Sequence, residues 1–258
     1  MRFMNCSFRL VLFILWVVTG CQNVPETPPP IRNWTGNWID DGIRQGILKN
    51  ETFLAAPTLP MELIFTPRTD SVFVQNGTFE AGVISFRTLK PNQRAVHLFD
   101  AEKPTILTLE DDHHLSFHNH RTGTDHTFVR ITGAITDKQT GAVMPNFFLE
   151  QLLKGQYRVS GQYKDEPNTD PVFTIHANGR AEGLGATHVQ LVIGGDLAAT
   201  DIDVISLISI SKRQVRHFGW RKDGSKLLLY YLVNAAGKDE KPEYKAGKAA
   251  FVLDRIGE

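Results

Sequence analysis

The sequence predicts an all-β protein made of two antiparallel barrels that are joined by a short linker containing a helix. Three observations support this prediction. From residue 34 onward, short segments alternate apolar and polar side chains, with turn-forming residues between them. One stretch with helical periodicity interrupts this pattern, and the landmarks that precede it recur after it. The 258 residues, 41% hydrophobic and 22% charged, are typical of a globular protein and suffice for two small domains.

Residues 1–20 have the composition of a secretion signal. A basic start precedes an apolar run over residues 10–18, which is too short to cross a bilayer as a helix. The run leads into Val-Thr-Gly-Cys at 18–21, which resembles the lipobox of bacterial lipoproteins. The resemblance implies a signal peptide over 1–20 and lipid attachment at Cys21. The alternative is an ordinary secretory signal followed by a chance cysteine.

Residues 21–33 are polar and rich in proline, so we expect an extended tether. In the sorting rule of enterobacterial lipoproteins, Gln22 after the lipidated cysteine implies the outer membrane. The expected location is therefore that membrane, with the folded part anchored by lipid and facing the periplasm or the cell surface. Cys6 would leave with the signal, so no free thiol or disulfide remains. A net charge of zero argues against a nucleic-acid partner.

The first barrel is expected over residues 34–133. Period-two alternation of apolar residues, broken by turn residues such as those at 67–70 and 76–77, indicates short antiparallel strands. We expect these strands over residues 61–65, 71–74, 82–87, 95–99, 105–109, 115–118 and 127–131.

Residues 134–154 are expected to form the linker with its short helix. Phe148, Leu149, Leu152 and Leu153 recur at helical spacing, and Gly155 is a plausible stop.

The second barrel is expected over residues 155–258, because three landmarks of the first stretch recur there in the same order. Trp-x-Gly-x-Trp at 34–38 corresponds to Leu-x-Gly-x-Tyr at 153–157. A hairpin with a polar turn follows in each stretch, at 107–117 and at 217–229. The last expected strand of each stretch contains Phe-Val followed by an arginine near its end. Duplication explains this pattern, and one larger β domain is the alternative.

The Gly-x-Trp opening, the meander of strands and the closing strand with its arginine resemble lipocalin-like (calycin) domains. In that family the opening tryptophan packs at the closed end of the barrel against an arginine of the last strand. The resemblance therefore implies that Trp38 packs on Arg130 in an aromatic–cation contact and that Tyr157 faces Arg255 in the second half. Barrel closure also removes the sheet edges that would otherwise aggregate.

Five of the nine histidines fall between residues 113 and 126. His118 and His120 are two residues apart on an expected strand, so they share a face, and His126 is expected in a loop nearby. Together with a carboxylate they could bind Zn²⁺ or Cu²⁺. The alternative, which we favour, is a solvated face opposite a core formed by Leu115 and Phe117. No metal is therefore expected.

Other chemistry-bearing patterns are weak. Asp201 and Asp203 share one face of an expected strand. If this face pointed inward, they could form an acid–base pair or bind a cation; if it pointed outward, they would be solvated. We expect them to point outward. The chain has no Gly-x-Ser-x-Gly, no phosphate loop and no His-Glu-x-x-His, and its glycine pairs lack the helix that a dinucleotide site requires. No catalytic residue and no cofactor is expected.

These observations favour an outer-membrane lipoprotein that works by binding. The expected partners are the membrane, through the lipid anchor, and either a small apolar ligand inside a barrel or an envelope protein. Two alternatives remain open: an envelope protein that senses metal or stress or acts as an inhibitor (immunity) lipoprotein, and a tandem-calycin enzyme acting on a terpenoid- or lipid-like substrate.

Overall fold

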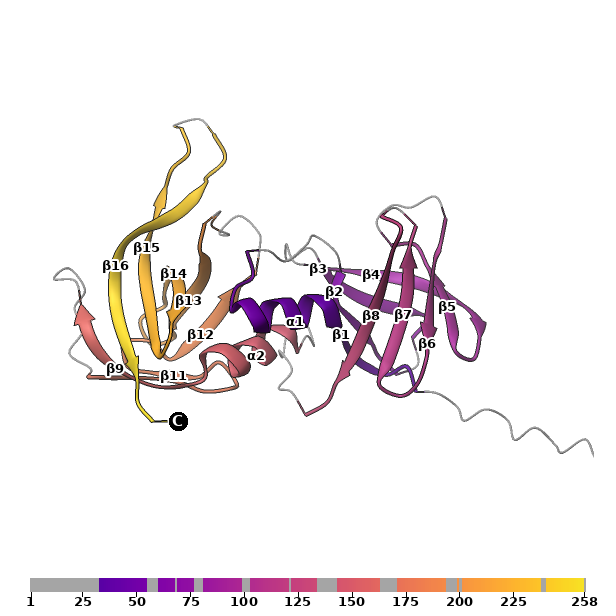
Figure 1. Cartoon of the computed structure of the whole chain (residues 1–258), viewed down its shortest axis with the longest axis horizontal. Coiled ribbons are helices and arrows are strands. Elements are labelled where there is room, and N and C mark those ends of the chain that lie inside the picture. Colours follow the sequence, from indigo (N-terminus) through magenta and orange to yellow (C-terminus); the bar gives the residue numbers. More distant parts are fainter. Residues whose placement is uncertain are drawn as a thin grey trace, which may run out of the picture. The chain divides into compact units, whose positions relative to one another are not determined.

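The computed structural model describes residues 33–54, 60–67, 69–76, 81–98, 103–120, 122–133, 143–162, 171–193, 199, 201–237 and 240–257. The expected signal peptide, Cys21 and nearly all of the tether lie outside these residues. The chain forms two eight-stranded antiparallel sheets, which confirms the all-β class (Figure 1). Within the described part, no helix is both long enough and apolar enough to cross a membrane.

The first sheet is a closed barrel. Each strand pairs with the next one along the chain, and the last strand pairs with the first, so no edge is left open. The strands are β1 (Gly36–Asp40), β2 (Pro60–Phe65), β3 (Ser71–Asn76), β4 (Ala81–Lys90), β5 (Gln93–Val96), β6 (Thr105–Leu109), β7 (His114–Asn119) and β8 (Thr124–Ile131).

Apolar side chains fill the interior of the first barrel. In β7, Leu115 and Phe117 are buried while His114 and His118 are exposed, as the alternation of a strand requires. The buried side chains that pack together are Trp34, Trp38, Leu63, Phe65, Val72, Val96, Leu98, Leu107, Leu109, Leu115, Phe117 and Phe128. The expected inward face of this strand is therefore confirmed.

The second sheet repeats the same winding. Its strands are β9 (Gly155–Gln162), β10 (Val172–Ile175), β11 (Ala181–Glu182), β12 (His188–Val192), β13 (Asp203–Ser209), β14 (Gln214–Asp223), β15 (Lys226–Asn234) and β16 (Tyr244–Arg255). Strand β16 pairs with β9. Strands β11 and β12 are the two ends of the strand order, and an isolated bridge between Arg180 and His188 lies next to them. A backbone hydrogen bond also runs from the Ala181 N–H to the Thr187 carbonyl (2.9 Å). The sheet is therefore barrel-like, but its two end strands do not pair along their length.

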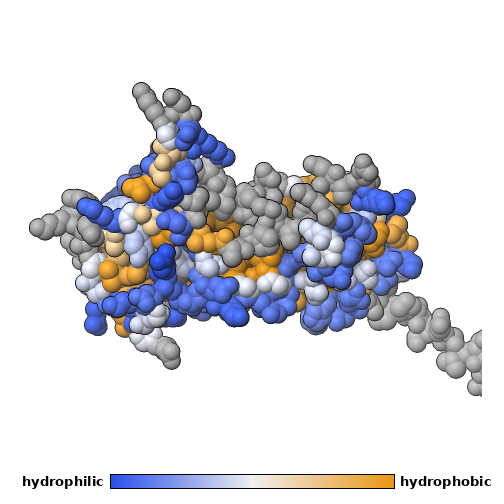
Figure 2. All heavy atoms as spheres, turned by 45° about the horizontal axis from the view of Figure 1, so that its top comes forward, coloured by the Kyte–Doolittle hydropathy of each residue, from blue (hydrophilic) through white to orange (hydrophobic). Residues whose placement is uncertain are grey.

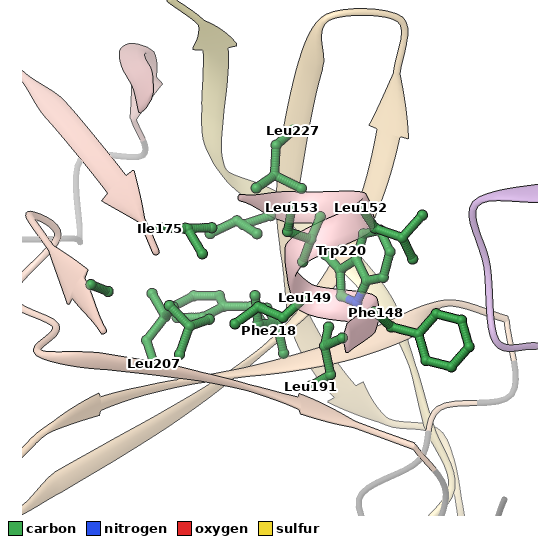
Figure 3. Packing of buried hydrophobic residues seen from close by; sticks show 14 of the residues in the cluster. Phe148, Leu149, Leu152, Leu153, Ile175, Leu191, Leu207, Phe218, Trp220 and Leu227 are labelled. Carbon is green, nitrogen blue, oxygen red and sulfur yellow. The ribbon is translucent and has the colours of Figure 1, made fainter. Parts of the chain in front are cut away.

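The linker helix packs within the core of the second sheet. It consists of α2 (Met144–Phe148) and a π-helical turn η1 (Leu149–Leu153), and Gly155 then begins β9. Its buried apolar side chains extend toward those of the surrounding strands (Figure 3). The labelled residues are Phe148, Leu149, Leu152, Leu153, Ile175, Leu191, Leu207, Phe218, Trp220 and Leu227. The helix thus contributes buried side chains to the core of the second sheet.

A buried carboxylate holds the start of this helix. Glu62 of β2 accepts hydrogen bonds from the backbone N–H groups of Val143 (2.8 Å) and Met144 (3.2 Å) and from Asn37 Nδ2 (2.8 Å). These amides have no partner within the helix, because they belong to its first turn. Burial raises the pKa of Glu62, although its three hydrogen bonds act in the opposite direction.

A second helix, α1 (Asp41–Asn50), follows β1 and was not expected from the sequence. Asp40 caps it, because the Oδ1 atom accepts a hydrogen bond from the Ile43 N–H at 2.9 Å. Ile43 and Ile47 lie four residues apart, and both are buried in the same cluster as the linker helix. Two glycines within the helix lower its propensity and conceal it in the sequence.

Exposed apolar side chains are scattered over different elements. The most exposed are Leu54, Val83, Ile210, Val215 and Val233. On the face shown in Figure 2, hydrophilic residues are interspersed with apolar ones. Single exposed apolar residues of this kind are normal on protein surfaces and identify no site by themselves.

Candidate functional site

The four residues expected at the barrel ends lie opposite one another in neighbouring strands. Trp38 pairs with Arg130, whose guanidinium carbon lies 4.5 Å from the ring centroid. Tyr157 pairs with Arg255 in the second sheet. Burial lowers the pKa of Arg130 and raises that of Tyr157.

The surroundings of these pairs also correspond. The Trp38 indole N–H donates to the carbonyl of Trp34 (2.9 Å), and the Tyr157 hydroxyl donates to the carbonyl of Leu153 (2.8 Å), each four residues back. A Cβ atom on Gly155 would lie 3.2 Å from Arg255 Nε, so the glycine gives the arginine room. The β1–β8 and β9–β16 strand pairs therefore share one local arrangement, which serves packing.

His118 and His120 lie on the surface of the first barrel. Their ring centroids are 5.1 Å apart, and His118 Nδ1 is 2.7 Å from Asp125 Oδ1. The side chain of His118 is 47% exposed. Within the described ranges, no three residues of the His, Cys, Asp or Glu type are placed to hold a metal ion.

His126 was expected in a loop, but it lies within strand β8. Its Nδ1 atom is 2.8 Å from Asp40 Oδ2, and its Nε2 atom is 3.0 Å from the Thr124 hydroxyl. The ring stacks on Phe117, with centroids 4.8 Å apart and an angle of 12° between the planes. His126 therefore has a different role from His118 and His120. It belongs to a chain of polar side chains that begins at Asp40, the capping residue of α1.

One concave polar site among the described residues is a cleft at the mouth of the second sheet. Its volume is about 320 Å³, near the lower limit of about 300 Å³ for small-molecule sites. The end of α1 and the following residues form one wall, and β13 and β14 form the other. The residues that line it are Asn50, Glu51, Thr52, Leu54, Asp201, Ile202, Asp203, Trp220, Arg221 and Lys222.

Asp203 is buried in this cleft and does not point into solvent, which corrects the expectation for this residue. Its Oδ1 atom accepts a hydrogen bond from the Phe53 N–H at 2.9 Å. Burial raises its pKa, while bonds from Thr52 and Phe53 and the charge of Arg221 act in the opposite direction. Asp201 is exposed and accepts from the Ala246 N–H, so the two carboxylates do not form an acid–base pair.

The charges around the cleft are mixed. Glu51 and Lys222 form an ion pair across it, and the Lys222 side chain is only 16% exposed. Arg221 is exposed at the rim. Trp220 contributes a buried indole ring, whose centroid lies 6.5 Å from that of Phe53. The cleft thus presents hydrogen-bond acceptors, donors and an aromatic wall within a small space.

A second, more open depression lies at the start of β9, with a volume of about 490 Å³. Lys154, His176 and Arg180 contribute basic groups to it. Two of these are already paired, Lys154 with Glu150 (3.1 Å) and His176 with Glu182 (3.4 Å). The cleft at β13 and β14 instead combines acceptors, donors and an aromatic wall, so we regard it as the stronger candidate.

Sequence reasoning missed the cleft because its walls come from residues 50–54, 201–203 and 220–222, which no local pattern connects. One signal was available: Asp40 followed by Ile43 and Ile47 is the pattern of a capped helix. Searches for similar proteins found no match among family models, curated proteins or solved structures.

Proposed function

We propose that this protein is a lipid-anchored envelope protein that binds a small polar ligand at the mouth of its second barrel and catalyses no reaction on it. The observation that carries this proposal is the cleft of about 320 Å³ around Asp203 and Arg221. Ligand sites are concave and combine an apolar wall with a few convergent polar groups. Trp220 supplies the wall here, and the charged and amide side chains supply the polar groups.

The packing of the barrels supports a polar ligand over the apolar ligand expected from the sequence. Large apolar side chains fill the first barrel, and apolar side chains of the strands and of the linker helix pack together in the second sheet. An apolar ligand inside either barrel would have to displace side chains such as Phe128 or Phe148, both fully buried. Each displaced side chain would lose about 1.5–3 kcal/mol of burial.

The composition of the cleft also limits the ligand. Glu51, Asp201 and Asp203 disfavour a purely anionic ligand, and Arg221 and Lys222 disfavour a purely cationic one. A ligand that carries both hydrogen-bond donors and acceptors satisfies both sets. Hydrogen bonds from such a ligand to charged groups are the strong ones, at about 1.5–3 kcal/mol each.

The anchor is tested by replacing Cys21 with serine. The wild type is expected in the membrane fraction, labelled with palmitate and shortened by its signal. Cys21→Ser is expected to remain an unlabelled precursor with its signal attached. Palmitate labelling that survives this substitution contradicts the anchor.

Binding is tested by native mass spectrometry of the protein released from membranes in mild detergent. We expect a bound small molecule on the wild type, and we expect Arg221→Gln to reduce its occupancy by tenfold or more, because a lost charged hydrogen bond of about 1.4 kcal/mol is a factor of ten. Arg158→Gln is the matched control, because Arg158 is an exposed arginine of β9 outside the cleft. Equal occupancy in both variants contradicts the proposal.

A further inference from the structure

A chain of hydrogen bonds joins an exposed hydroxyl of the first barrel to a buried carboxylate. Thr124 Oγ1 is 3.0 Å from His126 Nε2, and His126 Nδ1 is 2.8 Å from Asp40 Oδ2. The side chain of Asp40 is 5% exposed and that of His126 is 12% exposed, whereas Thr124 lies on the surface. Residues 40 and 126 come from the neighbouring strands β1 and β8.

The chemistry of the partners fixes the direction of each proton. An ionised carboxylate can only accept, so Asp40 requires a proton on His126 Nδ1. In the neutral imidazole, Nε2 is then an acceptor and receives the proton of the Thr124 hydroxyl. Thr122 Oγ1 lies 2.6 Å from Thr124 Oγ1, and its own hydroxyl donates to that oxygen because the proton of Thr124 is already committed.

Each member of the chain is held in place. The second oxygen of Asp40, Oδ1, accepts the Ile43 N–H at the start of α1 at 2.9 Å. The imidazole of His126 lies flat on the buried ring of Phe117, with centroids 4.8 Å apart. A carboxylate that orients an imidazole, which in turn polarises a hydroxyl, is the arrangement that activates nucleophiles in acyl transfer.

We infer from this geometry that Thr124 is an activated nucleophile that accepts an acyl group from small activated esters. The Thr124 oxygen attacks the ester carbonyl carbon while its proton moves to His126 Nε2. The bond from the carbonyl carbon to the leaving oxygen then breaks, and His126 returns the proton to the leaving alcohol. The products are one acyl-threonine and one alcohol. Asp40 acts as a positioning residue, because it touches only the imidazole.

This inference is independent of the binding cleft, because its groups belong to β1 and β8 and the cleft is lined by the end of α1, β13 and β14. It also assigns a use to one histidine of the cluster that has no part in the proposed ligand binding. Thr124 is open to solvent, so a small ester can reach it without a change in the fold.

The test is reaction of the purified protein with p-nitrophenyl acetate, followed by the release of p-nitrophenolate and by peptide mapping of the acetyl group. In the wild type we expect one acetyl group on Thr124, and in Thr124→Val we expect none at position 124. In Thr124→Ser we expect faster acetylation at this position, since a primary hydroxyl is less hindered. His126→Gln is expected to slow acetylation at residue 124 by about 100-fold or more, the range of general-base catalysis.

Thr127→Val is the matched control, because Thr127 is an exposed threonine of the same strand. It is expected to react as the wild type does. Acetylation confined to lysines, or acetylation of Thr124 at an unchanged rate in His126→Gln, overturns the inference. If His126→Gln does not fold, the comparison of Thr124→Val, Thr124→Ser and Thr127→Val decides the matter, because all three replace exposed side chains.

Discussion

Replacing Phe148 with alanine tests whether the linker helix stabilises the second sheet from within. Phe148 is fully buried, and its ring meets that of Phe53 edge to face, with centroids 5.2 Å apart. Its other neighbours are apolar side chains of the same cluster. The substitution removes the ring and leaves a cavity, which the surrounding close-packed side chains fill only in part.

The expected cost follows from this burial. Phenylalanine-to-alanine substitutions in protein cores cost about 3–5 kcal/mol, and domains have a free energy of unfolding of only about 5–15 kcal/mol. For a folded part of this size, each kcal/mol lowers the melting temperature by about 2–4 °C. We therefore expect Phe148→Ala to lower the melting temperature by about 6–20 °C.

The assay is urea and thermal unfolding followed by circular dichroism. Phe147→Ala is the matched control, because Phe147 belongs to the same helix but is only partly buried. It is expected to cost less than half as much. A loss below about 1 kcal/mol for Phe148→Ala, or equal losses for the two variants, refutes the reasoning that the helix fills this sheet.

Three further predictions follow from particular contacts. The pKa of Glu62 is raised on folding, so its contribution to the free energy of unfolding is full below the pKa of the unfolded carboxyl and is lost as pH rises through the folded pKa. Urea unfolding between about pH 4 and pH 8 should show this loss of stability in the wild type and not in Glu62→Gln. An equal fall in both contradicts it. Gly36 has a φ of +140° beside Arg130, whereas a Cβ on Gly46 of α1 meets nothing within 4 Å. Gly36→Ala should therefore lower the free energy of unfolding by about 1–3 kcal/mol, and Gly46→Ala should raise it by about 0.5–1 kcal/mol. A change of the same sign in both variants would contradict the account. Replacing His118 and His120 together with alanine should change stability by less than about 0.5 kcal/mol, and elemental analysis should find no stoichiometric metal. About one Zn or Cu per chain, lost in the double variant, would contradict this.

The fold class could be predicted because it depends on local periodicity. Strands alternate with period two, so Leu115 and Phe117 identify the inner face of β7 without knowledge of its partners. The linker helix was also visible, from the spacing of Phe148, Leu149, Leu152 and Leu153. That this helix would lie within the second sheet was not visible, because the strands that enclose it are distant in sequence.

The polar sites could not be predicted, because each one joins distant segments. Asp203 appears in the sequence as one of two alternating acids, yet its buried carboxylate is hydrogen-bonded by Thr52 and by Phe53, which lies 150 residues away. His126 appears as a member of a histidine cluster, yet its partner Asp40 lies 86 residues away. Residue type and local spacing do not encode such contacts, and the barrel closure between β1 and β8 creates the second of them.

The central claim, that the ligand site is the cleft and not the interior of the first barrel, is tested most directly by the indole N–H signals of ¹⁵N-labelled protein. Trp220 lines the cleft and also belongs to the core of the second sheet, whereas Trp34 and Trp38 lie in the first barrel. The probes are the water-soluble and the lipid-soluble extracts of the source cell envelope. The account predicts that the water-soluble extract shifts the Trp220 signal and leaves the other two unchanged. Shifts of Trp34 and Trp38 with the lipid-soluble extract, or no shift of Trp220 with the water-soluble one, would contradict it.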